Sequence, residues 1–502
     1  MLSLLIWIPI IGAGVIAFAP GAVSGAKARL GAIAVSGVLV AISALLLFQF
    51  DLANSGMQFQ EYIPWIESLG LNYQLGVDGL SLLLLALNSL LILVAVLSSK
   101  VDIERPRLFF SLILLIAGGV AGAFVAQNLL LFFLFYELEL IPFYLLVSIW
   151  GGSRRSYAAT KFLVYTAISG ACILLAFLGL VWFSDASTFA YDTLMGQMLP
   201  MGLQLVLLAL LLVGFGIKIP LVPFHTWLPD TYVEASTPVA ILLGGILAKL
   251  GTYGIFRFGL GLFPEAWAQL SPYLAIWAAV SIMYGAMAAI AQKDIKRMVA
   301  YSSIGHMGYI LLGAAALTSL SVIGAISQMV AHGLILAVLF NLVGVVEAKV
   351  GTRELDVLNG LMNPIRGLPA TSSLLVMGAM ASAGIPGLVG FIAEFLIFQG
   401  SYARFPVQTL LAVVGTGLTA VYFVILLNRT CFGKLDNATS YYPKVTFGEK
   451  VPALILATLI IFLGLQPTWL VRWVEPTGTA MVAAVPADSA AQVATLPASV
   501  VE

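Results

Sequence analysis

Long apolar runs separated by short polar segments make up most of this sequence. A helix that spans a bilayer needs about 20 predominantly apolar residues, and fourteen stretches of the chain satisfy this requirement. Their approximate centres are Ile11, Val40, Leu90, Gly118, Ile141, Leu174, Leu210, Gly245, Ala279, Ile310, Ile335, Met380, Val414 and Ile460. The first stretch, MLSLLIWIPIIGAGVIAF, has no basic residue before its apolar run. We therefore expect a first spanning helix there and not a cleaved signal peptide.

The polar segments alternate in charge along the chain. All but five of the 23 Lys and Arg residues follow the helices numbered 1, 3, 5, 9, 11 and 13. The loops after even-numbered helices carry acidic residues instead, namely Asp51, Glu61, Glu67, Asp78, Asp185, Asp192 and Glu265. Basic loops of membrane proteins stay in the cytoplasm. The alternation therefore predicts that both termini face away from the cytoplasm and that the loop Asn428–Lys450 is cytoplasmic.

Composition agrees with a membrane protein. The chain has 502 residues, of which 61% are hydrophobic and 9% are charged, whereas soluble domains have about 25% charged residues. The formal net charge is zero, so nothing in the overall charge favours a nucleic-acid partner. Cys172 and Cys431 form no CxxC motif, which excludes a cysteine-ligated cluster or zinc site. No glycine-rich nucleotide-binding loop follows a strand, and we expect no cofactor or metal in this chain.

Several ionisable residues lie inside the apolar runs. The segment FLFYELELIPFYLL contains Glu137 and Glu139, although a charge at the centre of a bilayer helix costs roughly 2.5–3.5 kcal/mol. Lys249 lies about 11 residues into its helix, which at ~1.5 Å per residue puts it near the midplane. The other candidates at membrane depth are Lys218, His306, His332 and Glu394. Structural ion pairs or interior hydrogen bonds remain the alternative for each of them.

Two of the apolar segments are interrupted beside a charged residue. Pro220 and Pro223 follow Lys218, and Gly384-Ile385-Pro386-Gly387 precedes Glu394. Proline ends or breaks a helix, and interrupted segments at corresponding positions of two halves are typical of inverted-repeat transporters. We therefore predict an all-α polytopic membrane protein with fourteen transmembrane helices, broken helices 7 and 12, and two inverted five-helix repeats, helices 4–8 and 9–13.

These repeats define the predicted domain boundaries. Residues 1–107 contain helices 1–3, residues 108–262 the first repeat and residues 263–428 the second repeat. Residues 429–475 contain the cytoplasmic loop and helix 14. After Trp473 the sequence is rich in small residues, has three prolines and lacks a helical stripe, so we expect a flexible tail at residues 476–502.

The residue types suit proton transfer. Burial disfavours the charged forms of both lysine and carboxylate, while pairing favours them. A Glu–Lys pair that opens and closes can therefore load and release a proton, histidine can relay it, and helix breaks can hold the water that a relay needs. Glu139 is ~200° around a helix from Glu137. It does not share a face with Glu137, and we expect it to contact another subunit or to be neutral.

Several motifs resemble a known family. FYELELIPFYLL, KIPLVPFHTWLPD, GILAKLGTYGIFRF, QKDIKRMVAYSSIGHMGY, QMVAHG and GIPGLVGFIAEF resemble the antiporter-like chain 4 of respiratory complex I. The doubled glutamate and RRSYAATKFLVYTA are most similar to the D subunit of the cyanobacterial and chloroplast NAD(P)H–plastoquinone oxidoreductase. The resemblance extends over helices 3–13 and implies the fourteen-helix fold. It also implies a proton-translocating subunit of a translocase in a thylakoid membrane, with a part in photosynthesis and cyclic electron transport.

The resemblance assigns roles by position. It implies that Glu137 pairs with Lys218, that Lys249 lies on the central polar axis, and that His306 and His332 bridge it to Glu394. Stand-alone antiporters of this fold usually carry lysine in place of Glu394. Secondary candidates are Glu139, His225, Asp230 and Glu234. The implied partners are sister antiporter-like chains, other membrane subunits and the lipid bilayer, while plastoquinone, iron–sulfur clusters and the electron donor are bound elsewhere in the complex.

One position departs from the family pattern. The family usually has a histidine two residues after WLPD, where this chain has Tyr232. This departure argues against the standard respiratory form and suits a paralogue specialised for inorganic-carbon (CO2) uptake, and both forms stay open. Two other functions also remain open from the sequence, a stand-alone cation/proton antiporter and a membrane scaffold without conduction. Four separate charged helices would be a costly scaffold.

Overall fold

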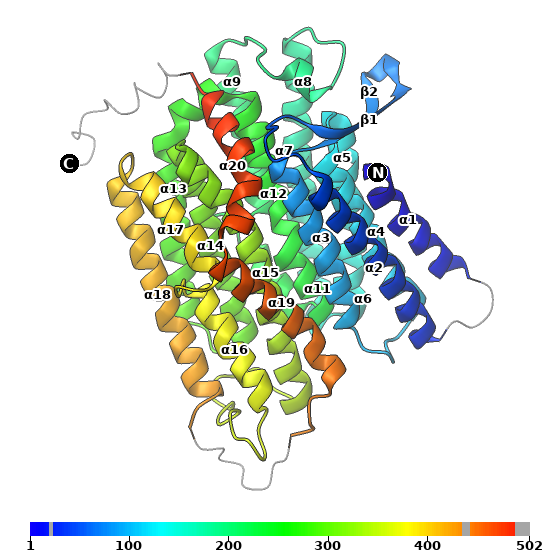
Figure 1. Ribbon diagram of the computed structural model, residues 1–502, viewed down its shortest axis with the longest axis vertical. Coiled ribbons are helices and arrows are strands. Elements are labelled where there is room, and N and C mark those ends of the chain that lie inside the picture. The colour runs from blue at the N-terminus through cyan, green and yellow to red at the C-terminus, as the bar shows by residue number, and fades with distance from the viewer. Residues whose placement is uncertain (20–23, 434–441, 487–502) are drawn as a thin grey trace.

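The protein is a bundle of helices with one small two-stranded sheet at one end (Figure 1). The computed structural model describes residues 1–19, 24–433 and 442–486. Lys434 and residues 487–502 of the predicted tail lie outside this part of the chain.

The N-terminal third combines helices with a hairpin. Its elements are α1 (Leu2–Phe18), α2 (Gly25–Gln49), β1 (Gln58–Ile66), β2 (Leu71–Val77), α3 (Gly79–Leu97), α4 (Pro106–Val125), α5 (Leu129–Leu138), α6 (Leu140–Trp150) and α7 (Arg155–Phe183). The antiparallel hairpin was not predicted, because its strands are short and lie between much stronger apolar runs. Figure 1 shows the hairpin, α8 and the start of α9 at the same end of the bundle.

The middle of the chain contains the most buried helices. Its elements are α8 (Tyr191–Leu194), α9 (Met201–Lys218), α10 (Trp227–Glu234), α11 (Thr237–Leu242), a π-helical segment (Leu243–Leu247), α12 (Ala248–Gly254), a second π-helical segment (Ile255–Leu260), α13 (Pro264–Ile290), α14 (Ile295–Ala316) and α15 (Ser319–Val350). α15 packs against α14, α16, α17, α19 and α20. It is therefore the central helix of the second half.

The C-terminal part covers α15. Its elements are α16 (Pro369–Ser382), α17 (Val389–Tyr402), α18 (Pro406–Thr430), α19 (Phe447–Leu465) and α20 (Thr468–Ala483). The flexible tail predicted at residues 476–502 is wrong for residues 476–483, because α20 continues through Pro476 to Ala483. α20 packs against α3 and α15, and its buried residues Leu470, Trp473, Val474, Thr477 and Gly478 lie on one face of the helix.

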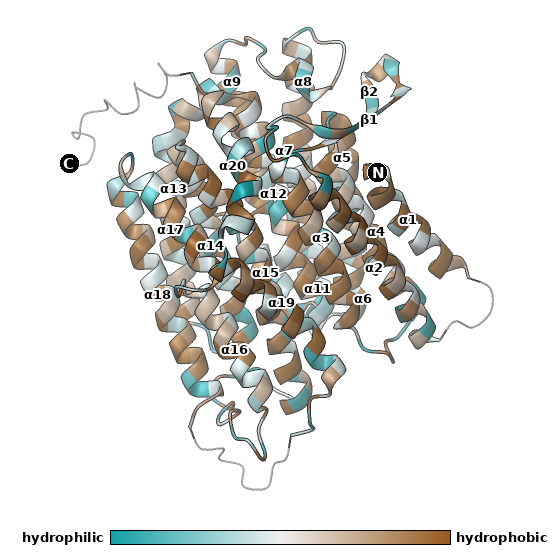
Figure 2. Ribbon diagram, in the orientation of Figure 1, coloured by the Kyte–Doolittle hydropathy of each residue, from teal (hydrophilic) through white to brown (hydrophobic). Residues whose placement is uncertain are grey.

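The all-α polytopic fold class is confirmed. Every one of the fourteen predicted centres lies within a helix. Among the described residues, eleven helices are long and apolar enough to cross a membrane, and α1 and α17 are shorter apolar helices. The number fourteen stays a prediction, as do the domain boundaries. Figure 2 shows hydrophobic residues along the bundle and hydrophilic ones concentrated toward its ends, as a bilayer requires.

The predicted breaks in helices 7 and 12 are present. α9 ends at Lys218, and α16 and α17 are separated by residues 383–388. Two further irregularities were not predicted. The fifth predicted helix is divided at Glu139, and the eighth contains two π-helical segments on either side of α12.

Candidate functional site

Glu139 lies at the junction between α5 and α6. Its carboxylate is fully buried and forms an ion pair with the ammonium group of Lys218, the last residue of α9. The ammonium group also lies 4.4 Å from the centre of the Tyr136 ring, within cation–π range. The second carboxylate oxygen of Glu139 is buried without a hydrogen-bond partner among the described residues. The ion pair is thus buried, and one of its carboxylate oxygens lacks a hydrogen-bond donor within the described chain.

This geometry corrects the expected pairing of Glu137 with Lys218. The carboxylate of Glu137 points toward α7, where a Cβ atom on Gly170 would come within 2.0 Å of its Oε1. In the described part of the chain the Glu137 carboxylate makes no hydrogen bond or ion pair, although the carbonyl oxygen of Glu137 accepts from the N–H of Glu139. Spacing along a helix separates the two glutamates onto different faces, but only packing against α7 and α9 decides which face meets Lys218.

The expectations for Glu139 are therefore also wrong. It was expected to contact another subunit or to be neutral, yet its side chain is inside the bundle and paired with Lys218 of the same chain. The roles assigned to the site residues remain predictions, because position alone does not establish conduction.

Lys249 is held in the centre of the eighth helix. Its side chain is fully buried. The ammonium group donates a hydrogen bond to the carbonyl oxygen of Gly244 at 2.6 Å and lies 2.8 Å from Nδ1 of His332 on α15. Gly244 belongs to the first π-helical segment, and π-bulges occur mostly as single turns that are frequent at functional sites. The irregular turn places a carbonyl oxygen within reach of the buried ammonium group.

Two histidines from the second half of the chain extend from Lys249 in a line of buried side chains. The rings of His332 and His306 have centroids 5.5 Å apart, and both residues are buried. His306 Nδ1 lies 3.4 Å from Glu394 Oε1, and its Nε2 lies 2.9 Å from Ser382 Oγ. A cavity of about 10 Å³ lies among His306, His332 and Glu394, enough for about one water molecule.

Glu394 lies one turn into α17, just past the break in helix 12. Its Oε2 accepts a hydrogen bond from Thr416 at 3.1 Å, and Thr416 in turn lies 3.0 Å from the hydroxyl of Tyr309. Gly384 in the break has φ +68°, and a Cβ atom there would lie 2.8 Å from Glu394 Oε2. Glycine is thus required both by the left-handed backbone and by the approach of the carboxylate.

The secondary candidates lie apart from this line. His225 is buried near the break in helix 7, with its ring edge-on to Tyr284 at 4.6 Å. Asp230 forms ion pairs with Lys161 at 2.8 Å and Arg297 at 3.4 Å. These contacts fix α10 against α7 and α14 at the basic end of the bundle.

Glu234 belongs to the same basic end and borders a cleft. It accepts a hydrogen bond from the backbone N–H of Arg154 at 2.9 Å. The cleft has a volume of about 610 Å³, and Lys100, Glu234, Lys296 and Arg353 are among its lining residues. Lys296, which sequence reasoning counted only as a loop residue, is buried and donates to the carbonyl oxygen of Ala235 at 2.6 Å.

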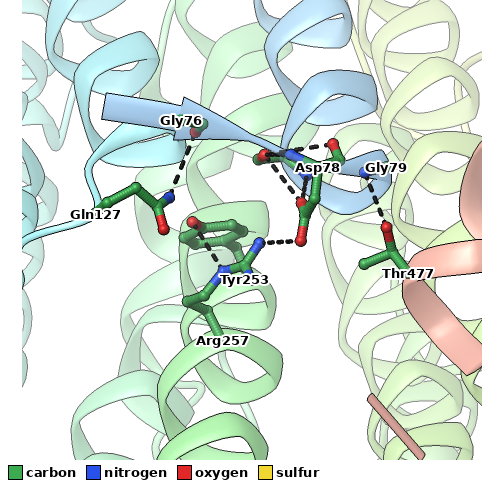
Figure 3. A network of polar contacts seen from close by, with 8 residues as sticks. Gly76, Asp78, Gly79, Gln127, Tyr253, Arg257 and Thr477 are labelled. Atoms are coloured by element: carbon green, nitrogen blue, oxygen red, sulfur yellow. Dashed lines mark hydrogen bonds and ion pairs between the residues drawn. The ribbon is translucent and has the colours of Figure 1, made fainter. Parts of the chain in front are cut away.

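A buried ion pair at the opposite end was missed. Arg257 Nη2 lies 2.6 Å from Asp78 Oδ2, and Arg257 Nε donates to the Tyr253 hydroxyl at 3.3 Å (Figure 3). Asp78 also caps the N-terminus of α3, and Thr477 of α20 accepts from the N–H of Gly79 at 3.0 Å. An aspartate directly before an apolar run is a recognisable cap signal, but no pattern in the sequence predicts that Arg257 would be its partner.

Tyr232, where the family usually has histidine, is fully buried. Its hydroxyl donates to the carbonyl oxygen of Leu243 at 2.9 Å, at the start of the π-helical segment. It therefore supports the irregular turn next to Lys249. No group of three or more His, Cys, Asp or Glu side chains within residues 1–19, 24–433 and 442–486 could hold a metal ion.

Comparison with known proteins identifies relatives over nearly the whole chain. The family described as NADH:quinone oxidoreductase/Mrp antiporter, transmembrane, matches residues 126–419. NAD(P)H-quinone oxidoreductase chain 4 1 of Synechococcus sp. (strain JA-3-3Ab) is 39% identical over 96% of this chain and 93% of its own length. NAD(P)H-quinone oxidoreductase chain 4 of Prochlorococcus marinus (strain NATL2A) is 41% identical over 93% of this chain and 88% of its own length.

Solved structures share the fold. A chain of respiratory complex I from Thermus thermophilus with bound NADH has a TM-score of 0.89 and 28% identity, and the match covers 97% of this chain and all of that one. A chain of the Mrp complex from Dietzia sp. DQ12-45-1b has a TM-score of 0.85 and 22% identity, with 98% of each chain covered. The second likeness shows the fold alone.

Proposed function

The chain belongs to the NADH:quinone oxidoreductase/Mrp antiporter family of membrane subunits, and we propose that it moves protons across a membrane as chain 4 of an NAD(P)H–quinone oxidoreductase. The observation that carries this proposal is the row of buried ionisable side chains from Lys249 through His332 and His306 to Glu394. Charged residues at membrane depth are costly and mark ion pathways. Here they come from four different helices, α12, α15, α14 and α17, and meet in one row.

The row supports a stepwise transfer. Lys249 can donate a proton to Nδ1 of His332, 2.8 Å away. A water in the small cavity can carry the proton from His332 toward His306, which lies next to Glu394. Histidine suits this relay because its protonation changes near neutral pH. Glu394, beside the helix break, then releases the proton to the far side.

The Glu139–Lys218 pair would control the first half of the path. While the pair is closed, each charge stabilises the charged form of the other. When it opens, Lys218 loses this stabilisation and can give up its proton toward Lys249. Among the described residues no hydrogen bond connects Lys218 with Lys249, so this step needs water, which the irregular backbone of helices 7 and 8 can hold. Glu137, a primary candidate from the sequence, becomes the secondary candidate for the same half, and Glu139 takes its place.

The redox chemistry would occur elsewhere in the complex. The named relatives are chains of NAD(P)H-quinone oxidoreductases from cyanobacteria, so we propose a thylakoid location and sister membrane subunits as neighbours. Plastoquinone, iron–sulfur clusters and the electron donor would be bound by those other subunits. The inorganic-carbon form of the complex stays a prediction, since the buried position of Tyr232 fits either form.

The experiment measures proton uptake per electron in proteoliposomes that contain the assembled complex. Lys249→Gln keeps a polar side chain but removes the titratable group, so uptake per electron is expected to fall clearly while quinone reduction continues. The control is Lys444→Gln, an exposed lysine on the loop before α19, which should behave as wild type. Unchanged proton uptake in the Lys249→Gln variant would exclude the proposed proton path through this row.

The same preparation distinguishes the stand-alone antiporter. A proton-translocating subunit should give the same uptake when sodium and potassium are replaced by choline, because electron transfer drives it. Exchange of sodium for protons by the isolated chain in vesicles, without an electron donor, would instead support the antiporter.

A further inference from the structure

A groove on the outside of the bundle lies between α2, α3, α15, α19 and α20. Its volume is about 570 Å³, and its walls are almost entirely apolar, with Leu47, Leu87, Leu334, Leu459 and Leu463 among the lining residues. Figure 1 shows α19 and α20 packed in front of α15 and α3, and both helices contact α3 and α15. The groove is therefore formed where the last two helices fail to close completely on the rest.

One basic residue lies in this apolar groove. The guanidinium carbon of Arg472 is 3.9 Å from the centre of the Trp469 ring and 5.5 Å from that of Trp473, and all three residues line the groove. Arg472 is one of the five basic residues that lie away from the predicted cytoplasmic loops. It belongs to α20, whose Thr477 contacts the start of α3 beside the hairpin. This places Arg472 toward the end of the bundle opposite the basic loops.

The guanidinium group is not satisfied by the protein. Nε of Arg472 is buried and has no hydrogen-bond partner among the described residues, and no described carboxylate lies within 4.0 Å of the side chain. A buried donor without a partner is unfavourable, and a charged one especially so. The two tryptophan rings stabilise the positive charge, but a ring face does not replace an oxygen acceptor for the N–H group.

We propose that this groove binds one anionic diacyl lipid, with its headgroup on Arg472 and an acyl chain along the apolar walls. Arginine binds phosphate-type oxygens through a planar fork of N–H donors. Tryptophan and arginine together are typical of the level of lipid headgroups. The apolar walls below them match an acyl chain, which a free phosphate ion does not have. A neutral quinone would bring only carbonyl acceptors to a full positive charge, so an anionic lipid fits the groove better.

A lipid in this groove would contact α15 close to His332. Val330 and Leu334, two residues before and after His332, also line the groove. A lipid there would pack against the stretch of α15 that carries His332 and would hold α19 and α20 against it. The lipid would thus belong to the support of α15 and would not be part of the proton path.

Lipid retention by the purified complex tests this proposal. The assembled complex is exchanged into detergent containing a small amount of phosphatidylglycerol, or of phosphatidylcholine, and the lipid bound to this subunit is counted by native mass spectrometry. Wild type should retain one phosphatidylglycerol on this chain and little phosphatidylcholine. Arg472→Ala should bind phosphatidylglycerol at least about tenfold more weakly, and Arg472→Lys should be intermediate because it keeps the charge without the fork.

Two further variants complete the test. Ala86→Trp fills the groove while leaving Arg472 in place, and it should expel the lipid. Glu475→Gln changes an exposed residue one turn away on α20, and it should retain the lipid as wild type does. Equal retention by wild type and Arg472→Ala, no preference for the anionic lipid, or a bound quinone or peptide in place of lipid would each overturn the proposal. So would retention that depends on residues 487–502 and not on Arg472.

Discussion

At the scale of single residues, the two neighbouring glutamates have separate positions. Glu139 is fully buried and paired with Lys218, whereas Glu137 is half-buried against Gly170. A buried carboxylate beside a buried ammonium group is stable only as a pair, because removing one partner leaves an uncompensated charge. The pair therefore carries more of the electrostatic energy of this region than Glu137 does.

Glu139→Gln should reduce redox-coupled proton uptake strongly, by about tenfold or more in this subunit's contribution. The variant keeps the shape of the side chain but leaves Lys218 without a counter-charge, which typically costs about 3–5 kcal/mol and is relieved by loss of the lysine's proton. Proton uptake per electron in proteoliposomes measures the effect, with assembly checked on native gels.

Glu137→Gln is the matched control, since it makes the same chemical change two residues away. It should have a smaller effect than Glu139→Gln. Combining Glu139→Gln with Lys218→Ala should be no worse than either change alone, because groups that act as one unit are not additive. A larger loss in Glu137→Gln than in Glu139→Gln would show that the ion pair seen here is not the functional one.

At the scale of helices, the irregular segments coincide with the buried charges. Lys218 ends α9, Glu139 separates α5 from α6, Lys249 lies between two π-helical segments, and Glu394 follows the gap before α17. An interrupted helix exposes carbonyl and N–H groups that a regular helix would use internally. Those groups can bind a buried ammonium or a water, and Lys249 does so by donating to the carbonyl oxygen of Gly244.

Gly384→Ala should lower proton uptake by disturbing Glu394 at the break in helix 12. The new Cβ atom would lie 2.8 Å from the carboxylate, and the residue has φ +68°. The strained backbone alone should cost roughly 1–2 kcal/mol. Thermal unfolding of the purified complex measures the strain, and proton uptake measures the displacement of the carboxylate.

Gly387→Ala separates these two effects. Gly387 also has positive φ, +91°, but a Cβ atom there would meet only Leu465, at 3.9 Å. Both variants should therefore lose stability, and only Gly384→Ala should lose proton uptake beyond that. Equal loss of uptake in both would mean that backbone strain, not contact with Glu394, explains the effect.

At the scale of the whole molecule, the basic loops predict the orientation in the membrane, and the degree of burial shows which helices form the core. The basic ends of the odd-numbered helices predict the cytoplasmic side. The window of α11–α12 with its π-helical segments is completely buried, whereas that of α2 is 28% buried. The helix that carries Lys249 is thus enclosed by other helices, and this arrangement keeps its charged side chain away from lipid.

Labelling of single cysteines tests the orientation. In a background without Cys172 and Cys431, Met198→Cys and Lys444→Cys should react with a membrane-impermeant maleimide from opposite sides. Both positions are exposed, and the first follows the sixth predicted helix while the second follows the thirteenth. Reaction of both from the same side would show that the number of helices between them is even and that the predicted topology is wrong.

The sequence by itself determined the membrane fold, the sites of two helix breaks and the buried ionisable residues Lys218, Lys249, His306, His332 and Glu394. Each of these follows from local chemistry: a spanning helix needs a long apolar run, proline interrupts a helix, and a charge in such a run is conspicuous. Only the tertiary structure decided which groups meet. Glu139 and not Glu137 reaches Lys218, Arg257 pairs with Asp78, and α20 packs against α3 and α15. The physical reason is that partners lie 79 and 179 residues apart, and their contact depends on how helices rotate and pack, which spacing along one helix does not specify.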